Sequence, residues 1–142
     1  PAQANYPPSD AQIAWHLGRF VEHVRSISAD PVVVRNNWLR AYDYTTDQGA
    51  AALSDFARTN DPFADIGRIQ VGVEVSSIIR ASPSSFRVAW TERRFIDGRL
   101  AGTERWTAIL TVTVQSPRTA DDLRKNPLGV LVHAFNWSKE ID

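Results

Sequence analysis

The sequence predicts an α+β domain in which helices come first and an antiparallel sheet follows. Apolar residues recur at helical spacing through the first half of the chain, and they alternate with polar residues through much of the second half. Helices in one part of a chain followed by consecutive strands favour a layered α+β fold. We expect a curved antiparallel sheet of about four strands packed around a long N-terminal helix.

The long helix is the first expected element. Ser9 and Gln12 have the spacing of a capping box, which marks a helix start. The apolar positions behind this box form a single helical stripe, made of Ile13, Leu17, Phe20, Val24 and Ile27. A chain of 142 residues has the length of one domain with a single hydrophobic core, and we assign residues 9–142 to it. Residues 1–8 contain prolines and show no periodicity, so we assign them to a linker before the domain.

Shorter helices are expected next. Asp30 and Pro31 fit the N-cap and the first position of a helix that runs to about Tyr44. The segment 45–48 signals a third helix, and the segment 60–62 starts one further helical turn. The first half of the chain is therefore helical, with several restarts.

The second half contains a strand near residues 69–75 and then a hairpin around Asp97 and Gly98. The hairpin register can be tested by asking which loop keeps apolar side chains opposite one another. A two-residue loop would oppose apolar to polar residues. A three-residue loop, 97–99, gives apolar pairs, namely Trp90 with Trp106, Val88 with Ala108 and Phe86 with Leu110. The same register opposes Glu92 to Glu104, a repulsion that nearby Arg94 can relieve.

A tight corner is expected before the last strand, at Asn126, Pro127, Leu128 and Gly129, after a short helix over 120–125. The Asn126 side chain can bond nearby backbone, and Pro127 fixes its own φ. Gly129 can take a positive φ at no steric cost. We therefore expect a rigid structural motif that carries no chemistry of its own.

The sequence contains no pattern that marks catalysis or metal binding. The absence of cysteine excludes disulfides, thiol catalysis and cysteine-ligated metals. No GxSxG, Walker-type, GxGxxG or HExxH spacing occurs. His16 and His23 are one heptad apart on the first helix, about 10 Å along its axis, so they cannot share a metal directly. We expect no catalytic residue, no metal and no cofactor.

Two groups of side chains are candidates for contacts with other molecules. Three arginines share one face of the expected hairpin: Arg87, Arg93 and Arg105. They suit an acidic partner or a phosphate backbone, although the solvated side of an antiparallel sheet explains them more simply. Four tryptophans are expected in the core: Trp38, Trp90, Trp106 and Trp137. The fifth, Trp15, lies beside His16 and Arg19 and either forms a contact surface or packs under the linker.

Along nearly its whole length the chain resembles the periplasmic domain of TrbF-type conjugal transfer proteins. These proteins are the inner-membrane assembly factors of VirB/Trb type IV secretion systems. The matching segments are Tyr6–Gln12, Val32–Leu39, Asn60–Phe63, Glu104–Ala108, Arg124–Gly129 and Phe135–Glu140. The Asn-Pro-x-Gly element of that family matches Asn126, Pro127 and Gly129 without departure.

The resemblance implies a fold similar to nuclear transport factor 2 (NTF2-like), in a single-pass inner-membrane protein with this domain in the periplasm. A membrane helix is then expected before residue 1, in keeping with a chain that lacks methionine and starts in a linker. The resemblance also implies a non-enzymatic scaffold that self-associates, often as a dimer, and contacts other channel components. The 16 basic and 16 acidic residues cancel, so we expect no direct nucleic-acid binding.

An enzyme on the same fold, similar to ketosteroid isomerase, is the main alternative, and a small-ligand binding module is another. Such proteins need an open cone-shaped pocket that holds a buried carboxylate, tyrosine or histidine. An open cone around Tyr42, Asp43 or His133 would favour the enzyme, whereas a filled cone would exclude it. For the carboxylates of Asp43, Glu92 and Glu104 we expect solvated surface positions.

Overall fold

Three helices precede three long strands, and a short helix separates those strands from a fourth. The computed structural model describes residues 7–141. The elements are α1 (Asp10–Arg25), α2 (Pro31–Tyr42), α3 (Asp47–Thr59), β1 (Ile69–Ser82), β2 (Ser85–Ile96), β3 (Arg99–Val114), α4 (Ala120–Lys125) and β4 (Val130–Lys139). The expected α+β order is confirmed. Most of the expected linker, residues 1–6, lies outside the described residues.

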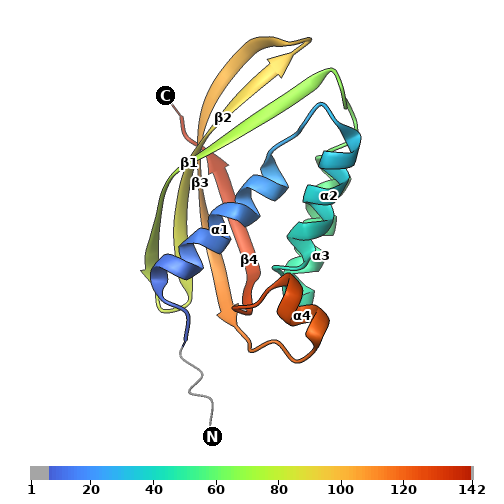
Figure 1. Ribbon diagram of the computed structural model, residues 1–142. Helices are drawn as coiled ribbons and strands as arrows, with labels where there is room; N and C mark the ends of the chain where they lie inside the picture. Colours follow the sequence, from blue (N-terminus) through green and yellow to red (C-terminus); the bar gives the residue numbers. More distant parts are fainter. Residues whose placement is uncertain (1–6, 142) are drawn as a thin grey trace, which may run out of the picture.

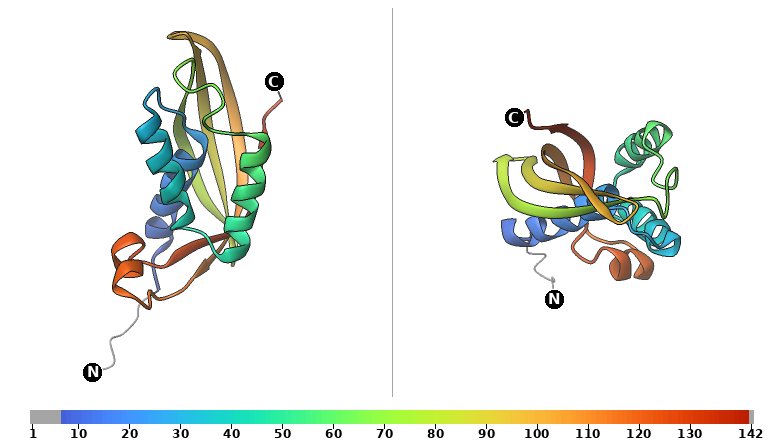
Figure 2. Two further views of the ribbon diagram at one scale, coloured as in Figure 1. Left: turned by 90° about the vertical axis from the view of Figure 1, so that its right-hand side faces the viewer. Right: turned by 90° about the horizontal axis from the view of Figure 1, so that it is seen from above.

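The four strands form one antiparallel meander in the order β1-β2-β3-β4. The sheet curls so that α1 lies across its concave face, with α2 beside α1, α3 against β4, and α4 next to the start of β4 (Figures 1 and 2). The hairpin of β2 and β3 projects at the end of the molecule opposite the N-terminus (Figure 1). None of the helices within residues 7–141 has the length and apolar character needed to cross a membrane.

The helix starts follow the expected caps. Ser9 accepts a hydrogen bond from the backbone of Gln12 while the Gln12 side chain accepts one from Ser9, so the capping box of α1 is complete. Asp30 and Thr46 cap α2 and α3 more simply, because their side-chain oxygens accept hydrogen bonds from the Val32 and Gly49 N–H groups. The single turn expected from residue 60 is present as hydrogen-bonded turns over residues 62–68, which do not extend into a helix, and Gly67 takes a φ of +86°.

The hairpin register is confirmed, although its loop is not the one expected. Trp90 lies opposite Trp106, as the apolar pairing predicted. The turn, however, has only two residues between the paired Ile96 and Arg99, and a bulge between the pairs of Arg94 and Phe95 shifts the strand by one residue. Asp97 and Gly98 both take positive φ, 50° and 79°, which is the backbone of a type I′ turn.

The core fills the space between α1 and the concave face of the sheet. The predicted α1 stripe is buried from Ile13 to Val24 and meets fully buried side chains from the strands: Phe86, Val88, Trp90 and Leu110. Each large apolar side chain buried in this way contributes about 1.5–3 kcal/mol to folding. Of the four tryptophans expected in the core only Trp90 is fully buried, and the other three are partly buried at the edge of the core cluster.

Candidate functional site

An ion pair lies between the end of α1 and the concave face of the sheet, in the space that we call the cone. Arg25, at the end of α1, donates to both carboxylate oxygens of Glu92 on β2, with nitrogen-to-oxygen distances of 2.7 and 3.0 Å. The Trp90 indole N–H donates to the same carboxylate at 2.8 Å. The two charged side chains are only 11% and 6% exposed. The surface position expected for Glu92 is therefore wrong, because the carboxylate lies inside the domain.

Aromatic rings surround the Arg25 guanidinium. Its central carbon lies 4.0 Å from the ring centroid of Trp106 and 5.3 Å from that of Trp137. Phe56 and Trp90 stand slightly farther away, at 5.8 and 6.0 Å. A guanidinium this close to several aromatic faces gains cation–π attraction in addition to its ion pair.

The two glutamates that face each other across the hairpin each have a cationic partner. Glu92 pairs with Arg25, and Glu104 pairs with Lys139 of β4 at 3.2 Å. Arg94, the partner suggested by sequence proximity, makes no ion pair among the described residues. The repulsion is therefore relieved by ion pairs with residues far away in the sequence and, without an ion pair, by the longer-range charge of Arg94.

The residues proposed for an open catalytic pocket do not meet inside the cone. Tyr42 and Asp43 line a surface groove of about 420 Å³, and His133 lines a different groove of about 730 Å³. The aromatic side chains around Arg25 line neither groove. His133 Nδ1 lies 3.0 Å from the hydroxyl of Thr46, which also caps α3, so the histidine joins β4 to that helix start. Burial raises the pKa of the Asp43 carboxyl, which lies at the end of α2.

The predicted corner before β4 is a closed turn. The Gly129 N–H donates to the Asn126 carbonyl at 3.1 Å, with Pro127 and Leu128 between them. The Asn126 side chain is buried, and its amide donates to the Val130 carbonyl at 2.8 Å and to the Asp43 carbonyl at 3.2 Å. One side chain therefore ties the end of α2, the corner and the start of β4 together.

Gly129 is the least replaceable residue of this corner. Its φ is +65°, a conformation that residues with a Cβ rarely adopt. A Cβ built at this position would lie 1.6 Å from the carbonyl oxygen of Gln115, at the end of β3. The Gly129 carbonyl in turn accepts a hydrogen bond from the Gln115 N–H at 2.9 Å. The strands β3 and β4 can approach this closely only because the residue is glycine.

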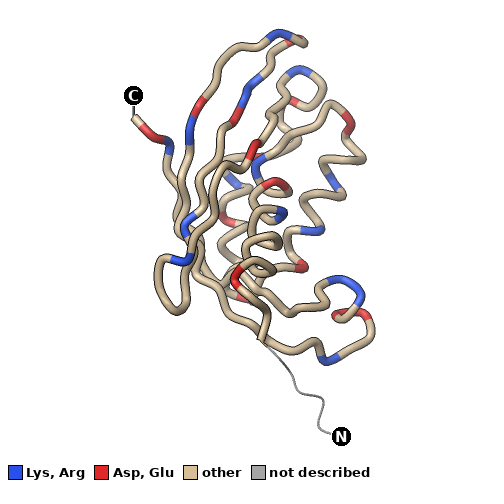
Figure 3. The backbone as a smooth tube through the Cα atoms, turned by 60° about the vertical axis from the view of Figure 1, so that its left-hand side comes forward, with Lys and Arg blue, Asp and Glu red and all other residues tan. Residues whose placement is uncertain are grey.

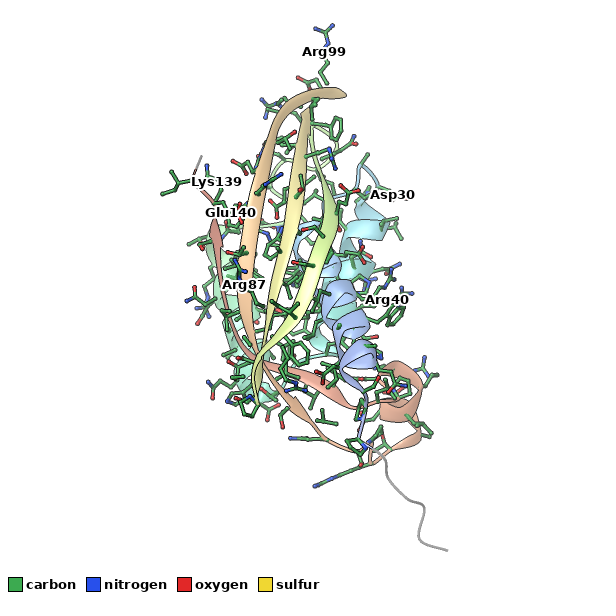
Figure 4. The ribbon with its side chains drawn as sticks, turned by 90° about the vertical axis from the view of Figure 1, so that its left-hand side faces the viewer. Asp30, Arg40, Arg87, Arg99, Lys139 and Glu140 are labelled. Atoms are coloured by element: carbon green, nitrogen blue, oxygen red, sulfur yellow. The ribbon has the colours of Figure 1, made fainter. Side chains whose placement is uncertain are left out.

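The three arginines of the hairpin lie on the outer face of the sheet. Arg87, Arg93 and Arg105 are exposed and alternate with the inward-facing core residues. Figure 4 shows Arg87 on the sheet and Arg40 beside the helices. Arg93 pairs with Glu74 of β1 at 3.2 Å. Along the described backbone basic and acidic residues are interspersed (Figure 3), so the arginines do not form a continuous basic track there.

The group expected on α1 is divided between surface and interior. Trp15 is 62% exposed, and the Arg19 guanidinium lies 5.8 Å from its ring centroid. His16 is only 7% exposed and packs between the rings of Trp15 and Tyr44, so it offers little surface of its own for a contact. Among residues 7–141 no group of three or more histidine or acidic side chains could hold a metal ion.

His23 makes the stability of the folded chain depend on pH. Burial lowers its pKa from 6.5 to about 4, and the nearby charges of Arg19 and Arg40 act in the same direction. Between these two pH values the unfolded chain binds a proton at this imidazole and the folded chain does not. Stability that is present above about pH 6.5 is therefore lost as the pH falls to about 4, by about 3 kcal/mol at most.

Urea denaturation across this pH range measures the effect. The variant His23→Gln should lose the part of the dependence that His23 supplies and keep the part from His16, whose pKa burial also lowers. The same dependence in the variant and the original chain would contradict the assignment to His23.

A curved four-stranded sheet with a long helix in its concave face, and with aromatic rings and an ion pair of the described residues inside it, defines an NTF2-like domain. A family model described as VirB8 protein matches residues 1–140. The chain therefore belongs to the VirB8 family, and the expected NTF2-like fold is confirmed.

Individual relatives agree with this assignment. The chain is 33% identical over 128 residues to the conjugal transfer protein TrbF of Rhizobium radiobacter, and the match covers 88% of this chain and 58% of TrbF. The chain thus spans 58% of the length of that relative.

Solved structures share the fold at lower identity. The TrwG component of a type IV secretion system from Bartonella birtlesii superposes with a TM-score of 0.79 at 19% identity, covering 94% of each chain. The VirB8 protein of Agrobacterium tumefaciens gives a TM-score of 0.78 at 12% identity, covering 96% of this chain and 98% of that structure.

Proposed function

We propose that the protein is a non-enzymatic structural component of a conjugative type IV secretion system. In this role it scaffolds the inner-membrane and periplasmic part of the channel through protein contacts. The observation that carries the proposal is the match of the VirB8 family model to residues 1–140. The TrbF relative, itself a conjugal transfer protein, supports the conjugative setting.

The filled cone supports a structural role over catalysis. Enzymes and small-ligand modules on this architecture need an open pocket with a poised polar group. Here the carboxylate of Glu92 is held by Arg25 and Trp90, and aromatic rings occupy the surrounding space. A substrate would have to break a buried ion pair before it reached this carboxylate.

The proposal includes a location and partners. The domain would lie in the periplasm, anchored to the inner membrane by a helix outside residues 7–141, and it would self-associate and contact other channel components. Tethering to a membrane raises the effective concentration of such partners, so that individually weak contacts can assemble a large complex. The balanced and interspersed charge argues against direct binding of the transferred DNA.

Deletion of the gene and complementation by the whole protein test this role. We expect deletion to abolish DNA transfer from donor cells and to prevent the remaining channel components from co-purifying in an inner-membrane complex. Complementation should restore both. Transfer at the original frequency in the deletion strain, with the complex intact, would contradict the proposal.

A further inference from the structure

The projecting hairpin of β2 and β3 carries an edge of the sheet that neither the cone nor the corner uses. Among the described residues β4 pairs with β3 only as far as Trp106, whereas β3 begins at Arg99. Residues 99–105 therefore run beyond the end of β4, and we call them the open edge of β3. Figure 4 shows Arg99 at the far end of the hairpin, with Lys139 and Glu140 nearer the body of the molecule.

The backbone of the open edge has hydrogen-bonding groups without a partner. Successive residues of an antiparallel strand direct these groups to opposite sides. The Arg105 carbonyl points away from β2, because it accepts a hydrogen bond from the Glu140 N–H at 2.8 Å. Thr103 points the same way, and no other backbone group within residues 7–141 pairs with it on that side. The chain leaves the sheet here, since Ile141 is 96% exposed and lies outside β4.

The other edge of the sheet is covered at the same end of the molecule. Ile27, after α1, pairs with Val71 of β1 through two backbone hydrogen bonds of 2.9 Å. Edge strands are usually protected by such a cover, by lysine, by proline or by a bulge. The open edge has a bulge at Ala101 but neither lysine nor proline, and residues 102–105 keep regular pairing with β2. A further strand can therefore pair along these residues.

Positive charge surrounds the unpaired backbone groups. Three exposed arginines of the hairpin form no ion pair with any residue of the described chain: Arg94, Arg99 and Arg105. Of the two carboxylates within residues 93–105, Glu104 already pairs with Lys139, which leaves Asp97 in the turn. Leu100 is 58% exposed and adds an apolar contact on the same strand.

We propose that the open edge of β3 receives an extended acidic segment of another protein of the assembly, which adds to the sheet as a further strand. The backbone of the segment pairs with Thr103, and its carboxylates pair with Arg99 and Arg105. The inference rests on the proposed scaffold function and adds to it the chemistry and the binding mode of one partner.

The kind of partner follows from the edge itself. The chain already places an acidic residue, Glu140, opposite Arg105, so this register accepts a carboxylate there. A second copy that offered the same edge would bring arginines against arginines, and like charges on paired strands are destabilising. Nucleic acid has no strand backbone that could continue the sheet at Thr103. The hairpin also lies at the end of the molecule opposite the start of α1 (Figure 1), away from the proposed membrane anchor.

Fluorescence anisotropy with two labelled peptides tests the charge of the partner. One peptide alternates glutamate with threonine and valine, and the other carries lysine at every glutamate position. We expect the original chain to bind the acidic peptide and not the basic one. The double variant Arg99→Glu/Arg105→Glu should weaken this binding about tenfold or more.

The matched control is Arg35→Glu/Arg87→Glu, which reverses the charge of two exposed arginines outside the hairpin tip. Neither of them forms an ion pair within the part of the chain that the structure describes. The control should alter acidic-peptide binding by no more than about twofold.

Two substitutions at Thr103 test the pairing of the backbones. Thr103→Pro removes the N–H that the added strand needs and leaves the hydrogen bonds to β2, because this N–H points away from β2. It should weaken acidic-peptide binding about tenfold or more. Thr103→Val keeps the N–H and a β-branched side chain, and it should bind within about twofold of the original chain.

Amide hydrogen exchange, measured by NMR on the original chain, gives a readout that does not depend on the folding of any variant. Saturation with the acidic peptide should slow exchange at the Thr103 N–H by about tenfold or more. Unchanged exchange at this N–H in the saturated complex would overturn the proposal, because the contact would then depend on charge alone. No binding of either peptide, equal affinity for both, or equal losses in the two double variants would also overturn it.

Two further results would overturn it in favour of other occupants. Binding to phosphatidylglycerol vesicles that Arg99→Glu/Arg105→Glu abolishes, without peptide binding, would assign the edge to a lipid surface. Dissociation of a dimer by Thr103→Pro and not by Thr103→Val in sedimentation would assign it to a second copy. Complementation keeps the two hypotheses apart: no peptide binding together with full DNA transfer by the whole protein carrying Thr103→Pro rejects the docking and leaves the scaffold role standing.

Discussion

The substitution Gly129→Val is expected to lower the free energy of unfolding by roughly 3–5 kcal/mol, from backbone strain and steric overlap combined. A β-branched residue is strained at the φ of +65° found here, and its Cβ would lie 1.6 Å from the Gln115 carbonyl oxygen. The corner can accept valine only by moving β4 away from β3, which also breaks the hydrogen bond between the Gln115 N–H and the Gly129 carbonyl. Urea denaturation of the purified chain measures this loss.

Alanine substitutions at Gly98 and Gly129 separate the cost of backbone strain from the cost of steric overlap. Gly98 has a similar φ of +79°, but a Cβ there would meet no heavy atom within 4 Å. Gly98→Ala should therefore cost about 1–2 kcal/mol from strain alone. Gly129→Ala should cost clearly more, because overlap with Gln115 is added. Equal losses in the two alanine variants would show that the close approach of the strands does not matter.

The second large effect is expected from Arg25→Ala, at about 3–5 kcal/mol of destabilisation. Removal of the guanidinium leaves the Glu92 carboxylate, which is 6% exposed, without its cationic partner. It also removes the cation–π contact with Trp106, whose ring centroid lies 4.0 Å away. Chemical denaturation at neutral pH tests the prediction.

The double variant Arg25→Met/Glu92→Leu is the matched control. Two apolar side chains of similar length replace both charges at once, so no unpaired charge remains in the interior. Such replacements of buried ion pairs are commonly neutral or stabilising. We expect the double variant to be markedly more stable than Arg25→Ala. The double variant also leaves the Trp90 N–H without its acceptor, which costs about 1–3 kcal/mol. A loss larger than this would mean that packing around Arg25, and not an unpaired charge, explains the single variant.

Much of the fold could be predicted from the sequence because periodicity and caps act locally. The α1 stripe, the caps at Ser9, Asp30 and Thr46, and the pairing of Trp90 with Trp106 all follow from patterns within one or two elements. The length of the hairpin loop could not be predicted in this way, because a two-residue loop with a bulge farther along the strand gives the same register as a three-residue loop.

The buried ion pair was missed although the sequence contained part of its signal. Glu92 continues the inward-facing series of Phe86, Val88 and Trp90, so its parity already places it on the core face. Its partner Arg25 is distant in sequence and falls off the apolar stripe of α1, and no local pattern joins the two. Only the packing of the end of α1 into the mouth of the cone brings them together.

The corner was predicted as rigid, but the reason for its rigidity is tertiary. Turn chemistry at Pro127 and Gly129 explains the local bend. The hydrogen bond from Asn126 to the Asp43 carbonyl and the approach of Gly129 to Gln115 involve residues far away in the chain. These contacts support the architectural role that we assign to the corner.

The most direct test of a role in architecture without catalysis is the frequency of DNA transfer when the only copy of the protein carries Arg25→Met/Glu92→Leu. This variant removes both ionisable groups from the cone and retains the corner and the outer surfaces. We predict transfer close to the original frequency, with the protein present at its normal level in the inner membrane. Loss of transfer by a folded and normally abundant variant would contradict the account, because the charges inside the cone would then carry the function.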